Sequence, residues 1–136
     1  MATLYTIGYG GRTPSQVADL LRKLGVGVLV DVRASPRSRV PGFSKAGLES
    51  FMPSHGVLYH HVEALGNANR FGGPDAPVQL VDEVGGLEWL RGCLNTRQLT
   101  ATLRGVAIMC TERDYWGCHR TYIADKMTGF EVVHIT

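Results

Sequence analysis

The sequence predicts an α/β fold: a single three-layer domain with a mainly parallel sheet and helices on both faces. Short apolar runs of strand length alternate with helical patterns along the whole chain, which is typical of parallel sheets. The chain has 136 residues, of which 44% are hydrophobic and 19% are charged, and it has no internal repeat. This length and composition suit one compact core, so we expect a single domain over residues 1–136.

The first expected unit is a strand, a helix and a second strand. Leu4–Ile7 is a short apolar run, and Thr13-Pro-Ser-Gln16 combines an N-cap, a proline at the first helical position and a glutamine that completes a capping box. Apolar residues at helical spacing follow, and Gly25 ends the helix. The continuously apolar run Val26–Val30 is typical of a strand covered on both faces. These segments predict a βαβ unit with a right-handed crossover.

The later segments continue the alternation. Apolar runs predict three more strands, at Val57–Val62, Val106–Cys110 and Glu131–Ile135. Helical patterns predict a short helix with Ser44 as its N-cap, which Pro53 bends or shortens, and a last helix at Cys118–Met127. Between them they predict a helical region, first Val78–Val84 and then Leu87–Leu94, in which Gly85-Gly86 leaves continuity open. Glycines and asparagines in Leu65–Asp75 predict a long, mobile loop over the site.

Reactive side chains gather in two loops that follow strands. Asp31 and Arg33 end the second strand two positions apart, so they point the same way at the edge where open α/β sheets bind ligands. The segment Cys110–Arg120 follows another apolar strand and contains two thiols, an imidazole, two carboxylates and two guanidiniums. We therefore expect both loops to contribute to one site. The alternatives are a structural ion pair between Asp31 and Arg33, and an ordinary solvated loop after Cys110.

Motifs along nearly the whole chain resemble one family. They are Thr6–Tyr9 with Arg12-Thr13, Asp31–Arg33 with Pro36–Arg39 and Pro41–Ser44, Leu65-Gly66, and Cys110–Glu112 with Cys118–Arg120. In this combination the chain is similar to the domain of unknown function 488 family. The resemblance implies a compact three-layer α/β domain and an enzyme, but it implies no particular activity.

The favoured reading is a small, hydrolase-like enzyme that acts on a phosphate-containing substrate, either a nucleotide or a nucleic acid. Arginines from separate loops suit bidentate contacts to phosphate, and the amino end of the helix that begins at Cys118 would add its dipole. Carboxylates would supply an acid or a base, and His119 a proton shuttle. The expected catalytic residues are Asp31, Glu112, Cys118 and His119, and the expected substrate-binding residues are Tyr9, Arg33, Arg37, Arg39 and Arg120.

Three other readings stay open. Cys118, placed beside His119 and Arg120, would make a thiolate for sulfur or acyl transfer in a rhodanese-like arrangement, although Trp116 stands where that arrangement needs an arginine. A zinc site from Cys110, Cys118, His119 and one more histidine lacks a close cysteine pair, so we expect no metal. A non-catalytic module that binds nucleic acid or another ligand is the last alternative.

Charge, apolar segments and cysteine content limit the partners and the cellular location that we expect. The net charge is only +2, which argues against extended binding of a nucleic-acid duplex. The N-terminus lacks a leader pattern and no stretch approaches the ~18 apolar residues of a membrane helix, so we expect a cytoplasmic protein without membrane contact. The 3 cysteines form no close pair, and we expect reduced thiols. The sequence specifies neither a cofactor nor an oligomeric state.

Overall fold

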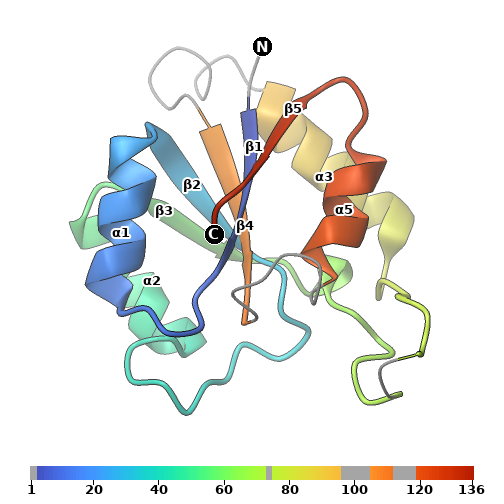
Figure 1. Cartoon of the computed structure of the whole chain (residues 1–136), viewed down its shortest axis with the longest axis horizontal. Helices are drawn as coiled ribbons and strands as arrows, with labels where there is room; N and C mark the ends of the chain where they lie inside the picture. The colour runs from blue at the N-terminus through green and yellow to red at the C-terminus, as the bar shows by residue number, and fades with distance from the viewer. Residues whose placement is uncertain (1–2, 73–74, 96–104, 112–118) are drawn as a thin grey trace.

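The computed structural model describes residues 3–72, 75–95, 105–111 and 119–136 (Figure 1). Within these ranges, five strands form one parallel sheet in the order β3-β2-β4-β1-β5. The strands are β1 (Thr3–Gly8), β2 (Val26–Asp31), β3 (Leu58–His61), β4 (Gly105–Cys110) and β5 (Glu131–His134). The helices are α1 (Pro14–Lys23), α2 (Lys45–Ser54), α3 (Glu83–Asn95) and α5 (Arg120–Lys126), with a short 3-10 helix, η1 (Glu63–Leu65).

Helices cover both faces of the sheet, as Figure 1 shows. On one face, apolar side chains of α1 and α2 pack against Ile7, Leu29 and Met109. On the other face, side chains of α3 and α5 pack against Leu4 and Val30. Every residue of β2 and of β4 is buried, because both strands lie inside the sheet with helices on both sides. The predicted α/β class is therefore confirmed.

The connections of the chain run toward opposite edges of the sheet after β1 and after β4. These two strands are neighbours, yet β1 leads into α1 on one face and β4 leads toward α5 on the other. Such a switch point, at the carboxyl ends of the strands, is where open α/β sheets bind their ligands. The main chains continue to pair just beyond it, since the Tyr9 amide donates to the Cys110 carbonyl at 3.1 Å and the Gly10 amide to the Thr111 carbonyl at 2.9 Å.

The predicted helix starts at Thr13 and Ser44 are confirmed. Thr13 and Gln16 form the complete capping box of α1, and the Ser44 side chain accepts a hydrogen bond from the Gly47 amide at the start of α2. Pro53 lies inside α2, which ends one residue later at Ser54. These local signals fix where both helices begin. Helix α2 begins directly after residues 34–44, which contain Arg37 and Arg39 and are called the arginine-rich loop below.

The helical region expected from Val78 begins only at Glu83, so the expected start is wrong. The continuity left open at Gly85-Gly86 is decided, because α3 runs through both glycines. Asp82 starts this helix: its side chain accepts from the Gly85 amide at 3.1 Å and its carbonyl from the Gly86 amide at 2.9 Å. Gly86 also packs closely, since a Cβ there would lie 2.8 Å from Cδ2 of Leu65. The glycines permit close packing here and do not break the helix.

The loop after η1 is held by hydrogen bonds. Asn67 pairs with Leu80 in an isolated bridge, and its side-chain oxygen accepts from the amides of Asn69 and Gln79 at 3.0 and 3.2 Å. These contacts join Asn67, inside the segment expected to be mobile, to Gln79 and Leu80 beyond its end. No helix within the described ranges is long and apolar enough to cross a membrane.

Candidate functional site

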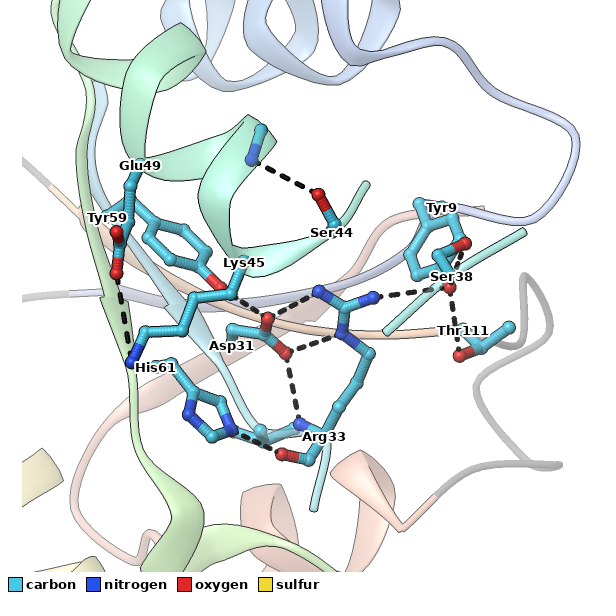
Figure 2. A network of polar contacts seen from close by, with 12 residues as sticks. Tyr9, Asp31, Arg33, Ser38, Ser44, Lys45, Glu49, Tyr59, His61 and Thr111 are labelled. Carbon is cyan, nitrogen blue, oxygen red and sulfur yellow. Dashed lines mark hydrogen bonds and ion pairs between the residues drawn. The ribbon is translucent and has the colours of Figure 1, made fainter. Parts of the chain in front are cut away.

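Asp31 and Arg33 form a buried ion pair at the carboxyl end of β2 (Figure 2). The Nε of Arg33 donates to Oδ1 of Asp31 at 2.8 Å, and Nη2 donates to Oδ2 at 2.6 Å. The Arg33 amide also donates to Oδ1 at 3.1 Å. Asp31 is fully buried and Arg33 is only 5% exposed. The two-point contact fixes the plane of the guanidinium, as arginine's geometry allows and lysine's does not.

Tyr59 completes the shell around the Asp31 carboxylate. Its hydroxyl donates to Oδ2 of Asp31 at 2.5 Å, so each carboxylate oxygen accepts two hydrogen bonds. Burial raises the pKa of Tyr59, and the negative charge of Asp31 raises it further. Burial acts to lower the pKa of Arg33, but its hydrogen bonds and ion pair with Asp31 outweigh that and raise the pKa. The carboxylate is therefore saturated, which suits an orienting role for Asp31.

Tyr9 connects the loops that follow three strands. Its hydroxyl donates to Oγ of Ser38 at 3.0 Å and accepts from Nη1 of Arg33 at 3.4 Å and from Oγ1 of Thr111 at 3.3 Å (Figure 2). Its ring stacks on Phe43, with centroids 4.2 Å apart. The loops after β1, β2 and β4 thus meet at one buried hydroxyl beside the switch point.

The backbone on both sides of Arg37 is held in place. The Pro36 carbonyl accepts from the Lys45 amide at 3.0 Å, and Ser38 accepts from Tyr9 on one side and from the Val40 amide on the other. The side chain of Arg37 is exposed, and so is that of Arg39. Neither guanidinium makes a hydrogen bond or ion pair with another described residue. The loop therefore has a fixed path but presents unpaired arginine side chains.

A cavity of about 560 Å³ lies between this loop, the start of α2 and the end of β3. Its charged and imidazole-bearing walls are Arg37, Lys45, His61 and Glu63. The remaining lining residues are small or hydroxyl-bearing: Ala34, Ser35, Pro36, Ser44 and Ala46. Among the ionisable groups of these walls, cationic side chains outnumber the single carboxylate.

His61 and His119 hold consecutive carbonyl groups of the segment that follows β2. Nε2 of His61 lies 2.7 Å from the Arg33 oxygen, and Nε2 of His119 lies 2.7 Å from the Val32 oxygen. A carbonyl only accepts, so each Nε2 carries a hydrogen. The predicted residue His119 thus contacts the main chain between Asp31 and Arg33, although it makes no cap hydrogen bond at the start of α5.

Arg120 is fully buried and contacts a cysteine. Its Nη1 is 3.0 Å from Sγ of Cys110, a side chain packed on the α3 and α5 face. Arg33 contacts Tyr9, which packs on the α1 and α2 face. The structure therefore brings Tyr9, Asp31 and Arg33 together but gives Arg120 no contact with them among the described residues. The helix expected to begin at Cys118 begins at Arg120 among the described residues, with His119 as its N-cap, and the expected anion contact at its amino end stays a prediction.

Two of the expected catalytic residues, Glu112 and Cys118, lie outside the described residues, and their roles stay predictions. Cys110 is disulfide-bonded, so the expectation of three reduced thiols is wrong for this residue. Cys93 is a free thiol, and burial raises its pKa. Within the described ranges, no group of three histidine, cysteine, aspartate or glutamate side chains is arranged to hold a metal ion.

The site residues expected from the sequence do not include Tyr59, Ser38, Thr111, Lys45 or His61. The register pairs Leu29 with Tyr59 and Asp31 with His61, which puts both β3 side chains on the Asp31 face. The sequence predicts part of this arrangement: side chains alternate along β3, so only one of His60 and His61 can face the site. His60 instead contacts the ring of Trp89, with centroids 5.7 Å apart.

Comparison with known proteins gives one match. A family model described as "Domain of unknown function DUF488" matches residues 13–73. This range includes α1, β2, the arginine-rich loop, α2 and β3, and it contains every residue that lines the cavity. No curated protein matches the chain, and no solved structure does.

Proposed function

We propose that this chain, which belongs to the domain of unknown function DUF488 family through residues 13–73, is a small hydrolase-like enzyme that acts on a phosphate-containing substrate. The substrate, a nucleotide or a nucleic acid, would place its phosphate in the cavity beside α2. The carboxyl edge of a parallel sheet is the usual ligand edge of this fold class, but the fold alone assigns no function. The proposal therefore depends on the residues of the site.

The observation that carries the proposal is that two cationic side chains and one imidazole line the cavity. Arg37, Lys45 and His61 come from the loop after β2, the start of α2 and the end of β3, and all line the same space. Guanidinium, ammonium and imidazole groups are the usual phosphate ligands in proteins, and charge-assisted hydrogen bonds are the stronger kind. The amino end of α2, a helix of 10 residues, adds a smaller favourable field.

The buried network beside the cavity supports the proposal because it fixes the loop that presents Arg37. Asp31 orients Arg33, Arg33 contacts the Tyr9 hydroxyl, and that hydroxyl holds Ser38, the residue after Arg37. A site whose contacts are held in place before the substrate arrives loses less entropy on binding. In this proposal Asp31 positions other groups, whereas His119 and Glu112 are the acid or base to be tested.

Binding is tested by titrating the protein with inorganic phosphate, mononucleotides and a short oligonucleotide. Arg37→Ala and Lys45→Ala should each weaken binding by about 10-fold or more, since each removes a charge-assisted contact. Lys23→Ala is the matched control, because Lys23 is exposed at the end of α1 and does not line the cavity. If all three substitutions weaken binding equally, or if none of them does, the cavity is not the phosphate site.

Catalysis is tested separately with Glu112→Gln on any compound that binds. If Glu112 is a general acid or base, turnover should fall by on the order of 10²-fold while affinity stays. If Glu112 only holds an arginine, stability and affinity should fall together. Compounds that bind tightly but are turned over by neither the wild type nor Glu112→Gln would favour the non-catalytic binding module.

A further inference from the structure

We infer that His61 is the proton-linked contact of this cavity: its Nδ1 takes up a proton when a dianionic phosphate group binds, and donates that hydrogen to a phosphate oxygen. The inference rests on the proposed function, because it concerns the same cavity. It goes further by assigning a role to a residue outside the expected site and by predicting that affinity depends on pH. The proton comes from solvent, and no covalent bond forms or breaks.

The hydrogen bond to Arg33 decides which nitrogen of His61 faces the ligand. The Arg33 carbonyl, 2.7 Å from Nε2, can only accept, so Nε2 carries the hydrogen in both the neutral and the charged ring. In the neutral ring Nδ1 is then the nitrogen with the free lone pair. Nδ1 makes no hydrogen bond with another described residue, and the side chain lines the cavity. An added proton would therefore reside on Nδ1.

The main chain and the neighbouring strand fix the position of this ring. His61 is paired in register with Asp31, whose carboxylate is already saturated by Arg33 and Tyr59. Asp31 thus has no acceptor position left for the imidazole. The ring is held at one nitrogen and open at the other, as in histidines that transfer protons or bind ligands.

The charged groups around His61 come from three elements. Arg37 in the loop after β2 and Lys45 in α2 carry positive charges, and Glu63 in η1 carries a negative one. Lys45 also lies 3.8 Å from Glu49, a long and exposed contact. A bound dianion favours the charged form of the His61 ring, because it attracts a third positive charge as well as Arg37 and Lys45.

The test uses sulfate, which stays dianionic over the neutral pH range, so that any pH dependence belongs to the protein. The wild-type affinity for sulfate should fall roughly 10-fold as the pH rises from about 5.5 to about 8, through the ordinary imidazole range. Calorimetry at about pH 7, in buffers of different ionisation enthalpy, should show net proton uptake on binding.

Two substitutions separate the two ring nitrogens. His61→Gln keeps a donor near the position of Nε2 but cannot titrate, so it should bind sulfate at all pH values with the weak affinity of the wild type at about pH 8, without proton uptake. His60→Gln is the control, since His60 is exposed and contacts Trp89, and it should keep the wild-type pH dependence. A melting curve checks that each variant is folded.

The outcomes distinguish this inference from the proposed function. Sulfate binding without proton uptake, or with the same pH dependence in His61→Gln, would overturn the role of His61 and leave the phosphate site standing. Failure of the wild type to bind sulfate, phosphate or nucleotide at any pH would overturn the phosphate site itself. If His61→Gln does not fold, the proton uptake of the wild type decides the question.

Discussion

Asp31 and Arg33 contact each other through two hydrogen bonds of 2.8 and 2.6 Å, in a place where neither side chain is more than 5% exposed. Removing the charge of one partner from such a pair leaves the other buried and uncompensated. Asp31→Asn should therefore lower the free energy of unfolding by about 3–5 kcal/mol, measured by urea denaturation at neutral pH.

The matched control for this prediction is Asp19→Asn. Asp19 is exposed on α1, so its substitution should change stability by no more than about 0.5 kcal/mol. Similar losses in both variants would mean that net charge, and not the buried pair, determines the effect.

Tyr9 should influence ligand affinity without contacting the ligand. Tyr9→Phe keeps the ring that stacks on Phe43 but removes the hydroxyl that holds Ser38 and accepts from Arg33. We expect sulfate affinity to fall about 5-fold, since one neutral hydrogen bond contributes on the order of 1 kcal/mol. Tyr5→Phe is the control, because the Tyr5 hydroxyl makes no hydrogen bond with a described residue. If Tyr9→Phe binds sulfate as tightly as Tyr5→Phe does, the arginine-rich loop does not depend on this contact.

Gly66 lies against the start of the arginine-rich loop. A Cβ at this position would be 2.5 Å from Cα of Ala34 and 2.9 Å from its amide nitrogen, so the backbone would have to move. Gly66→Ala should cost about 1–3 kcal/mol of stability and also weaken sulfate binding, because Ala34 lines the cavity. In Gly92→Ala the added methyl meets nothing within 4 Å, and this exposed helical position should gain about 0.5–1 kcal/mol. A neutral Gly66→Ala variant would contradict the close packing.

His134 should make the folded state sensitive to mild acid. Burial lowers the pKa of His134, and the positive charge of Arg120 lowers it further. Because the folded-state pKa is then below the unfolded-state value of about 6.5, the unfolded chain binds more protons as the pH falls below 6.5, and stability decreases. The wild type should lose more of its melting temperature between about pH 7.5 and about pH 5 than His134→Asn does. The melting temperature of His60→Gln should fall as much as that of the wild type. An equal fall in the wild type, His134→Asn and His60→Gln would mean that groups other than His134 cause the acid sensitivity.

The sequence by itself determined the features that depend on neighbouring residues. The capping box at Thr13 and the N-cap at Ser44 are local hydrogen bonds, so their residues alone predicted where α1 and α2 begin. Continuous apolar runs predicted the buried strands β2 and β4, and the alternation of strands and helices predicted the α/β class. Asp31 and Arg33 were predicted to face one way because side chains alternate along a strand.

Only the tertiary structure decided which distant residues meet. Periodicity says on which side of a strand a residue lies, but not which strand lies beside it, so the contact of Tyr59 with Asp31 depended on the pairing of β2 with β3. For the same reason, no pattern within either loop predicts that the two strands before Arg33 and Arg120 send their chains to opposite faces of the sheet. The cavity required α2, β3 and the arginine-rich loop to converge, and that convergence comes from packing between elements that no local pattern encodes.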